Sequence, residues 1–455
     1  MPASRWRWAE TPLLVLTALG LVWGILTSTL PYALAESHPE LALRLDPDNP
    51  VALVALAERA RTRLLDLIAP PEPTATVASK PSAGPEPAAE TTASDPPSAP
   101  DQKEAAAEIA SLKTTIGSLA RRAIASDPFN ARAFRLLGEM ADDPERIRFL
   151  MQEAVKRSRR EWIAVLWLMA DSFERNNFAD VVDKADILLR TGSNFTPEAM
   201  NYLTGLAATP EGQAALIATL AKAPPWRRSF FENLPGSVQY AATPYELMAA
   251  LKTAGSAPSD AELAPYLRVL MRENLVIDAH DIWLQFERDD EAAPVPLLND
   301  ADFADEPSGL PFEWSVRRGS NATVEYARLG ENDRGQSVKF AFGVGRSQFP
   351  ELSQVVVLQP GRYRLSGEFG GMIKAKRGLR WEMKCWRGKE LAKTDMIYGH
   401  PRVAWQAFSL DIEVPDEESC RSQQLRLFHD ARSSSEQLIS GEISLRHLSL
   451  VAVTQ

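Results

Sequence analysis

Side chains with catalytic chemistry are present in this sequence, but their spacing matches no familiar catalytic arrangement. Glu368 and Glu382 could serve as the acid pair of a glycoside hydrolase if they lay at a suitable separation. The sequence contains no phosphate-cradling glycine loop and no nucleophile elbow. Metal-ligand spacing is also missing among the five histidines, which are His38, His280, His400, His429 and His447. We therefore predict a protein without catalytic activity, cofactor or metal site.

The two cysteines, Cys385 and Cys420, could form a disulfide bond. Cys385 lies on the apolar face of a predicted strand, and Cys420 lies in the loop sequence "PDEESCRSQ". Cysteines in an extracytoplasmic compartment usually pair. We predict this disulfide, which would stabilise the fold by roughly 3 to 4 kcal/mol. The alternative is two unpaired buried thiols.

The segment "GLRWEMKCW", residues 378–386, alternates as a half-buried β-strand does. Its apolar positions are Leu379, Trp381, Met383 and Cys385, and the charged positions between them are Arg380, Glu382 and Lys384. Trp386 then breaks the alternation and falls on the polar face, where burial does not explain it.

Two other predicted strands add outward-facing residues. The alternation in "AWQAFSLDIEV" places Trp405 and Asp411 opposite the core positions, and that in "GRYRLSGEF" places Arg364 and Glu368 outward. Planar rings with charged groups beside them would form a binding surface if these strands shared one sheet. The residues that such a surface would combine are Trp386, Trp405, Arg364, Arg380, Glu382 and Lys384.

These strands belong to a C-terminal region with the texture of an antiparallel β-sandwich. After about residue 294 the sequence consists of short β-branched and aromatic segments separated by Gly, Pro, Asn and Asp turns. Residues 296–455 resemble the jelly-roll carbohydrate-binding modules, which have galactose-binding-like folds. Most of the resemblance lies in "LQPGRYRLS", from Leu358 to Ser366.

This resemblance implies that the sandwich binds sugars. Such modules place planar aromatic side chains against pyranose rings and bond the hydroxyls with charged and amide groups. The six residues named above thereby become a candidate glycan-binding face. The alternative is that Trp386 and Trp405 cover a sheet edge or dock on the helices. The calcium site of many modules has a faint parallel in Asn299, Asp300, Asp302 and Asp305, for which we favour a solvated acidic loop.

A region nearer the N-terminus resembles the tetratricopeptide repeat (TPR), whose helical hairpins stack into an α-solenoid. The resemblance rests on "LALRLDPDNPVALVALAERA", residues 41–60, and "RRAIASDPFNARAFRLLGEMA", residues 121–141. The signature positions are Ala42, Pro47, Ala123, Pro128, Phe134, Leu137, Gly138 and Ala141. Small residues let adjacent helices approach closely, and proline ends one helix and fixes entry to the next.

We predict the first TPR-like helices at residues 36–68 and a degenerate TPR-like solenoid at 105–293. Its last helical piece is expected from Ala261 to Phe286. Residues 69–104 are rich in Pro, Ala, Ser and Thr, so we predict a disordered insertion in the turn of one helical hairpin. The alternative is a linker between a membrane-proximal helix and an independent solenoid.

The N-terminal region predicts a membrane helix. Residues 11–30 carry no charge and would span about 30 Å as a helix, the thickness of a bilayer's hydrocarbon core. Because Arg5 and Arg7 precede this run, the positive-inside rule places residues 1–10 in the cytoplasm and the rest outside.

We therefore predict a transmembrane signal-anchor at residues 11–35, in a bacterial inner membrane, with most of the chain in the periplasm. The alternative is a cleaved signal peptide, for which Ala33 and Ala35 offer a small-x-small cleavage pattern, and a soluble periplasmic protein.

The composition is that of an ordinary globular protein, with 24% charged and 45% hydrophobic residues in a chain of 455. A formal net charge of −10 argues against nucleic acid as the main partner, because binding to phosphates depends on clustered Lys and Arg.

The expected architecture is multidomain, with a transmembrane helix, an α-solenoid and a C-terminal jelly roll. This layout resembles TPR proteins of bacterial exopolysaccharide assembly systems. The resemblance implies an adaptor whose solenoid binds a protein partner and whose sandwich touches polysaccharide or another subunit. One alternative is a structural envelope scaffold without sugar affinity, and another is an extracytoplasmic glycan hydrolase.

Overall fold

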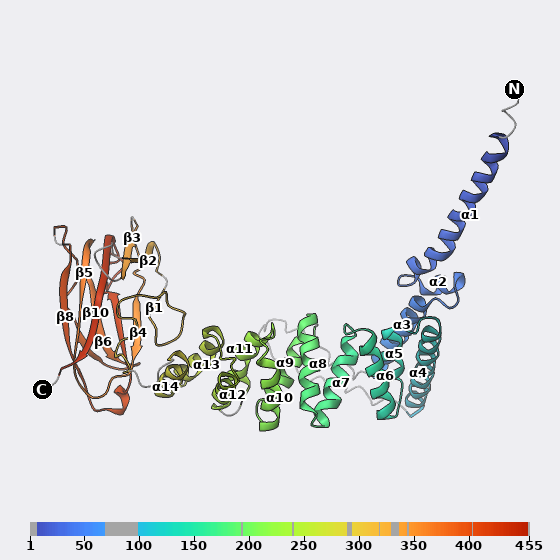
Figure 1. Cartoon of the computed structure of the whole chain (residues 1–455), viewed down its shortest axis with the longest axis horizontal. Helices are drawn as coiled ribbons and strands as arrows, with labels where there is room; N and C mark the ends of the chain where they lie inside the picture. Colours follow the sequence, from blue (N-terminus) through green and yellow to red (C-terminus); the bar gives the residue numbers. More distant parts are fainter. Residues whose placement is uncertain are drawn as a thin grey trace, which may run out of the picture. The chain divides into compact units, whose positions relative to one another are not determined.

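A computed structural model shows a chain of helices followed by two β-sheets (Figure 1). The residues it describes are 7–68, 99–192, 194–238, 241–288, 294–317, 319–328, 336–343, 345–402 and 404–453. The chain divides into two compact units, Met1–Tyr202 and Leu203–Gln455.

The described residues of the first unit form helices and the turns that connect them. The helices are α1 (Arg7–Leu34), α2 (Pro39–Leu45), α3 (Pro50–Ile68), α4 (Ala99–Ser126), α5 (Ala131–Glu139), α6 (Pro144–Arg157), α7 (Trp162–Glu174), α8 (Phe178–Thr191) and the start of α9 (Thr196–Leu206). Local signals set their ends. Asn130 accepts a hydrogen bond from the Ala133 N–H at the start of α5, and Gly192 ends α8 with a left-handed φ of 65°.

Helix α1 contains the expected apolar segment. Its stretch Thr17–Leu34 is long and apolar enough to cross a membrane. The large apolar side chains of Leu21 and Trp23 are exposed, as they would be in a helix facing lipid. A helix of this kind near the N-terminus fits either an anchor or a signal sequence, so both predictions for residues 11–35 remain open.

The helices on either side of the predicted insertion pack against each other. Residues 69–98, which hold most of it, lie outside the described residues. Leu53 of α3 shares one buried core with Ile116 and Ala120 of α4, so the two helices form a packed pair, as the insertion model requires. Helix α4 already begins at Ala99, so the last part of the predicted insertion is helical. Its Ala and Glu residues favour that state.

The predicted TPR signature residues lie at or near helix contacts. Ala42 and Ala123 are fully buried. Gly138 of α5 lies against α6, because an added Cβ would be 3.0 Å from the methyl group of Met151. The remaining signature residues lie in α5 or in the turns beside α3 and α5, and they are Pro47, Pro128, Phe134, Leu137 and Ala141. This placement agrees with their expected packing, and membership of the repeat family stays a prediction.

The second unit begins with further helices. They are the end of α9, α10 (Pro210–Leu220), α11 (Arg227–Ser237), α12 (Thr243–Thr253), α13 (Asp260–Arg272) and α14 (Val276–Glu287). The single helical piece expected from Ala261 to Phe286 is wrong, because the chain turns between α13 and α14. Asn274 adopts a left-handed φ of 64° there, a conformation that Asn tolerates better than most residues do.

The rest of the second unit contains two antiparallel five-stranded sheets, which confirms the predicted sandwich. The sheet that we call the β6 sheet has the order β1 (Ser315–Val316), β4 (Leu352–Val356), β9 (Gln423–His429), β6 (Leu379–Cys385) and β7 (Glu390–Lys393). The other, the β5 sheet, has the order β2 (Ala322–Arg328), β3 (Gln336–Phe342), β10 (Ile439–Ala452), β5 (Gly361–Ala375) and β8 (Gln406–Val414).

The two sheets share one hydrophobic core between them. Trp381 of β6 stacks on Phe408 of β8 across this core, with ring centroids 6.1 Å apart and planes 15° apart. Trp381 and Met383 are fully buried, as the alternation of β6 predicted. Each sheet therefore keeps its other face for solvent or for partners.

Candidate functional site

The six predicted glycan-face residues do not form one surface. Arg364 lies on β5 and Trp405 directly precedes β8, so both belong to the β5 sheet. Arg380, Glu382 and Lys384 lie on β6, in the opposite sheet. The predicted single glycan-binding face is therefore wrong. Strand alternation predicts which face of its sheet a residue occupies, but not to which sheet the strand belongs.

The charged residues of β6 are engaged with their own sheet. Glu382 is 6% exposed and accepts a hydrogen bond of 2.5 Å from Nε of Arg426 on β9. Arg380 donates to the carbonyl oxygen of Thr394 and lies 3.1 Å from a carboxylate oxygen of Asp430. Lys384 is half-buried on the same strand. Glu382 and Arg380 thus have partners within the protein, and because their side chains are also largely buried they are less available to a ligand.

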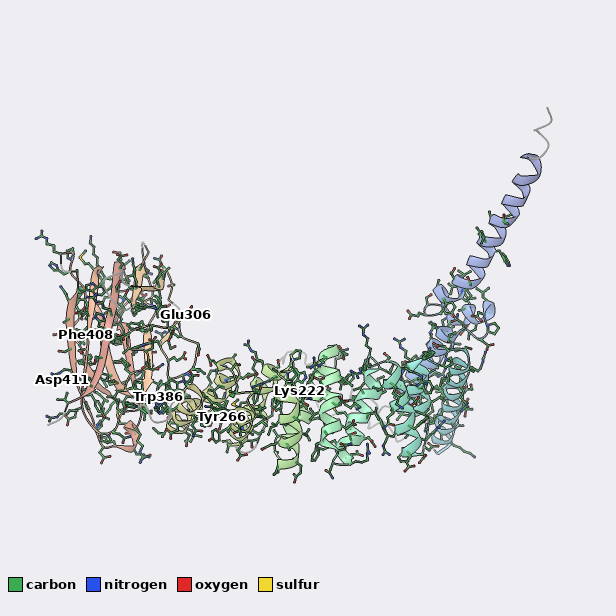
Figure 2. All side chains as sticks on the ribbon, viewed as in Figure 1. Lys222, Tyr266, Glu306, Trp386, Phe408 and Asp411 are labelled. Atoms are coloured by element: carbon green, nitrogen blue, oxygen red, sulfur yellow. A yellow bond between two sulfur atoms is a disulfide. The ribbon has the colours of Figure 1, made fainter. Side chains whose placement is uncertain are left out.

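Trp386 lies in the turn after β6, at the end of the sandwich near α13 and α14 (Figure 2). The next residue, Arg387, donates hydrogen bonds to the carbonyl oxygens of Arg272 and Met271 at the end of α13. A cation is favoured at that position because it interacts with the negative end of the helix dipole. Trp386 is half-buried, and its location agrees with the alternative that it docks on the helices.

Trp405 lies on the outer face of the β5 sheet, beside Gly370 and Arg446. The indole packs against Gly370 of β5, where any side chain would crowd it, because an added Cβ would be 3.1 Å from the ring. The guanidinium of Arg446, from β10, lies over the ring with Cζ 4.0 Å from the centroid. The indole is half-buried. It is therefore held in one position on an otherwise polar sheet face.

Polar and charged side chains lie around the Trp405 ring. Arg446 Nε donates a hydrogen bond of 2.7 Å to Glu368 of β5, its partner in the strand register. Nδ1 of His447 lies 3.7 Å from the same carboxylate. His447 has a left-handed φ of 51° and lies where the pairing of β5 and β10 shifts register. This irregularity turns an additional polar side chain toward the outer face.

The same face continues along β5 and β8 to a second charged pair. Arg364 donates a hydrogen bond of 2.6 Å to Asp411, and this guanidinium lowers the pKa of the Asp411 carboxyl. Ser366 and Ser409 pair directly between the two ends of this row. Arg364 and Glu368 are four residues apart, or about 13 Å along a strand. We call the residues of this row the β5 face: Trp405, Arg446, Glu368, Ser366, Ser409, Arg364 and Asp411.

Such a face has the chemistry for an extended, hydroxyl-rich ligand. It offers one fixed aromatic ring, two carboxylates, two guanidinium groups and two hydroxyls, all from an open sheet. Sequence alternation had already placed Trp405, Arg364, Glu368 and Asp411 outward. It missed Arg446, although the alternation of "ISLRH" on β10 would have placed that residue outward as well.

Comparison with known proteins identifies sandwiches similar to the C-terminal region. No family model matches the chain, and no curated protein matches it. A solved structure of TmCBM61 in complex with β-1,4-galactotriose is 18% identical, with a TM-score of 0.25, over 35% of this chain and 100% of that one. A CBM4 structure is 12% identical, with a TM-score of 0.26, over 34% of this chain and 99% of that one.

A carbohydrate-binding module (CBM6cm-2) from Cellvibrio mixtus lichenase 5A, in complex with cellotriose, is also similar. It is 11% identical, with a TM-score of 0.21, over 32% of this chain and 100% of that chain. These structures are carbohydrate-binding modules, and each is similar to about a third of this protein.

The structure also locates the possible glycosidase pair and the acidic loop that the sequence suggested. Glu368 and Glu382 lie on strands of opposite sheets, so they do not flank a common bond as a glycosidase pair would. In the acidic loop, Asp300 accepts hydrogen bonds from the backbone N–H groups of Ala304 and Asp305. Its carboxylate therefore stabilises a turn.

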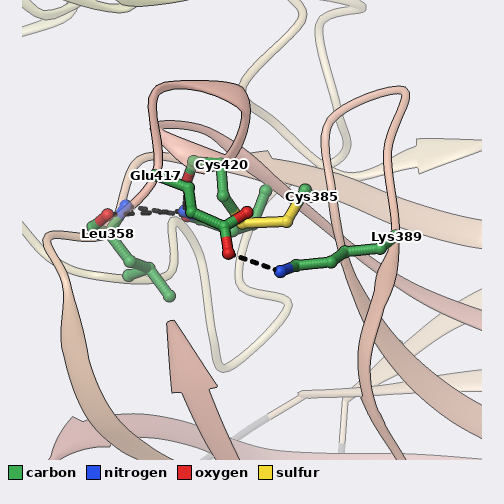
Figure 3. The surroundings of a disulfide bond; sticks show 6 residues. Leu358, Cys385, Lys389, Glu417 and Cys420 are labelled. Atoms are coloured by element: carbon green, nitrogen blue, oxygen red, sulfur yellow. Dashed lines mark hydrogen bonds and ion pairs between the residues drawn. A yellow bond between two sulfur atoms is a disulfide. The ribbon is translucent and has the colours of Figure 1, made fainter. Parts of the chain in front are cut away.

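The predicted disulfide is present. Cys385, at the end of β6, is bonded to Cys420, and Figure 3 shows the surrounding residues. Lys389 donates to a carboxylate oxygen of Glu417 at 2.7 Å beside it. A disulfide is typical of an extracytoplasmic location.

Proposed function

We propose that this chain is a membrane-anchored, extracytoplasmic adaptor that binds envelope polysaccharide with its sandwich. The observation that carries the proposal is the β5 face, where Trp405 is fixed on Gly370 and surrounded by hydrogen-bonding groups. The Trp405 ring would contact the apolar side of a sugar that displaces Arg446 from it, and the carboxylates, the serine hydroxyls and Arg364 would bond the sugar hydroxyls. The disulfide and the apolar α1 helix support a location outside the cytoplasm.

A groove in the first unit supports the second half of the adaptor role. It has a volume of about 530 Å³ between α4, α5 and α6. Lys113, Arg121 and Arg146 line it together with the apolar side chains of Leu137 and Met140. Asp142 also lines the groove, so three cations and one carboxylate leave it positive in a chain whose net charge is −10. We propose that it holds an acidic segment of a partner protein of the polysaccharide assembly or export machinery.

Glycan affinity of the purified full chain tests the first part. Soluble envelope polysaccharides should bind, and Trp405→Ala should weaken binding about tenfold, since aromatic contacts contribute about 1 to 1.5 kcal/mol. Trp162→Ala, which removes another partly exposed tryptophan on α7, is the matched control and should bind normally. A scaffold without sugar affinity would show no binding. A loss with Trp386→Ala but not with Trp405→Ala would move the site to the opposite sheet.

The groove has its own test, independent of glycan. An acidic Glu-rich dodecapeptide should bind the full chain, and an Arg121→Gln, Arg146→Gln double variant should weaken it at least fivefold. Arg190→Gln removes a surface cation paired with Asp186 on α8 and should leave the affinity unchanged. Equal affinity for all three proteins would exclude the groove as the binding site.

A further inference from the structure

The second unit contains a cleft that the β5 face does not use. Its volume is about 580 Å³, within the range of small-ligand and peptide sites. Its lining comes from helix α14, from Val295 to Asn299 with Phe312, from the end of β4 with the chain that follows it, and from the loop between Pro415 and Arg421.

The open part of the cleft floor is largely aliphatic, because the aromatic Trp283 and Phe312 that also line it are 6% and 1% exposed. Ile277 and Leu284 of α14, Leu297 and Val357 line it and are only half-buried, and Val295 is 43% exposed. Aliphatic side chains gain by covering one another, whereas sugars are usually recognised through aromatic rings. The floor thus favours an occupant with aliphatic side chains of its own.

The rim of the cleft is acidic. Glu417 is paired with Lys389 at 2.7 Å, and Glu418 with Arg421 at 3.1 Å. Asp416 has no cationic partner among the residues that the structure describes. Asp281 of α14 lies 3.8 Å from Nδ1 of His280, but burial lowers the pKa of that imidazole and so favours its neutral form. Two carboxylates at the rim therefore lack a compensating positive charge.

A buried donor at the cleft also lacks a partner. Trp283 lines the cleft and is 6% exposed, and its Nε1 has no hydrogen-bond acceptor within the described parts of the chain. Buried N–H groups are nearly always bonded, because leaving one unpaired is unfavourable. Nε1 is itself covered in the free protein, so a carbonyl oxygen of an occupant would reach it only after the indole shifts toward the cleft.

The cleft is held in shape before any occupant arrives. Cys420 fixes the acidic loop through its disulfide to Cys385 (Figure 3). The side chain of Gln423 accepts a hydrogen bond from the Leu358 N–H and donates one to the carbonyl oxygen of Cys420. These bonds connect the acidic rim directly to the strand end beside the floor. A preformed site loses less entropy on binding.

We propose that this cleft binds an extended, positively charged peptide segment of a partner protein. Aliphatic side chains of the segment would cover the floor, its Lys or Arg residues would pair with Asp281 and Asp416, and a backbone carbonyl would accept from Trp283. The site differs from the basic groove of the first unit in that it selects the opposite charge.

Fluorescence anisotropy of a labelled dodecapeptide of alternating Lys and Val, added to the purified full chain, tests the proposal. Two control dodecapeptides replace every Lys with Ser or with Glu. We expect the Lys/Val peptide to bind at least tenfold more tightly than the Ser/Val peptide. The Glu/Val peptide should bind no better than the Ser/Val peptide. The affinity should fall as salt is raised from 50 to 300 mM, as expected for charge pairing at an exposed rim. An Asp281→Asn, Asp416→Asn double variant should weaken binding at least fivefold.

The control is Glu413→Gln, which neutralises an exposed carboxylate at the end of β8 that lies close to the acidic rim in sequence but does not line the cleft. It should bind the Lys/Val peptide normally, and all variants should keep the wild-type unfolding midpoint because the changed residues are exposed. Equal weakening by Glu413→Gln would show diffuse charge attraction and overturn the proposal. A cello-oligosaccharide that displaces the peptide, or self-association of the chain that the double variant abolishes, would assign the cleft to a different occupant and also overturn it.

Discussion

The guanidinium of Arg446 lies over the indole ring of Trp405, 4.0 Å from its centroid, while Nε of the same arginine bonds to Glu368. One aromatic side chain, one cation and one carboxylate of the β5 face are thereby coupled. The cation covers part of the ring that a sugar would use. Under the proposed function, a sugar that stacks on Trp405 would have to displace Arg446 from the ring.

Removing this cation should strengthen the binding of a neutral glycan. A cation–π contact at a partly exposed site is worth about 0.5 to 1 kcal/mol, and stacking of a sugar on the same ring face has to displace it. We expect Arg446→Ala to raise the affinity two- to fivefold, and Arg446→Lys, which keeps a cation, to change it less. Calorimetric titration with one neutral oligosaccharide measures the difference. Weaker binding by Arg446→Ala would show that the guanidinium itself bonds the sugar.

The disulfide should contribute substantially to the stability of the sandwich. Cys385 and Cys420 are 35 residues apart in sequence, and closing a loop of that size lowers the entropy of the unfolded chain. Reduction should lower the free energy of unfolding by about 3 to 4 kcal/mol. Urea unfolding with and without reductant measures this change. A Cys385→Ser, Cys420→Ser variant is the control, and any response of that variant to reductant would show that the reagent acts elsewhere.

The strands and the disulfide could be predicted because both depend on local sequence. The alternation of β6 placed Trp381 and Met383 in the core, and both are fully buried. The composition of the candidate face could not be predicted, because the pairing of strands depends on residues far apart in sequence. Arg380 and Arg364 both face outward on their strands, yet they lie on opposite sheets.

In the helices, too, some features of the fold could not be predicted from the sequence pattern. Apolar periodicity predicted the helices, but it continues through the turn at Asn274 that separates α13 from α14. The sequence pattern also gave no sign of the register shift between Arg446 and Ser449 on β10. The turn contains the left-handed residue Asn274, and the register shift contains the left-handed residue His447. The presence of an Asn or a His in a sequence does not by itself predict that conformation.

Arg135 of α5 should be essential for the packing of the first unit. Its side chain is 1% exposed, and it pairs with Glu58 of α3, Glu139 of α5 and Glu161. Burial alone would lower its pKa, but Glu139, Glu58 and Glu161 raise it above the ordinary value. The guanidinium therefore stays charged and joins segments that are distant in sequence.

Arg135→Met should lower the free energy of unfolding by about 3 to 5 kcal/mol, because it leaves the buried Glu161 and the partly buried Glu58 without their cation. Urea unfolding measures the loss. Arg190→Met removes the exposed pair with Asp186 and should cost less than about 1 kcal/mol. Adding Glu161→Gln to Arg135→Met should recover part of the stability. If Arg135→Met were as mild as Arg190→Met, the buried network would not be what holds these helices together.

The packing of α14 on the sandwich should depend on pH through two groups with opposite effects. The imidazole of His280 contacts the Phe312 ring, with centroids 5.0 Å apart, and burial lowers its pKa. Burial, followed by the charges of Asp260 and Glu313, raises the pKa of Glu287 to about 7. The folded state thus disfavours a protonated His280 and an ionised Glu287.

The two signs follow from proton linkage. Below about pH 6.5, the ordinary pKa of histidine, the unfolded state takes up a proton on His280 more readily, so the free energy of unfolding falls as the pH falls. Glu287 takes up its proton on folding, so its contribution is largest at low pH and is lost as the pH rises from 4.5 to about 7. Although burial of the carboxyl raises the pKa of Glu287, much of the residue is exposed, so solvent screens the repulsion and reduces the size of its effect.

Single variants separate these contributions. Relative to the wild type, Glu287→Gln should raise the urea midpoint at pH 8 and leave it unchanged at pH 4.5. His280→Gln should flatten the acid side of the profile between pH 7 and pH 5, whatever its effect on the absolute midpoint through lost ring contacts. Urea midpoints from pH 4.5 to 8 for the three proteins measure both slopes. Parallel profiles for all three would mean that neither group titrates differently in the folded chain, and that α14 is held to Phe312 by apolar contact alone.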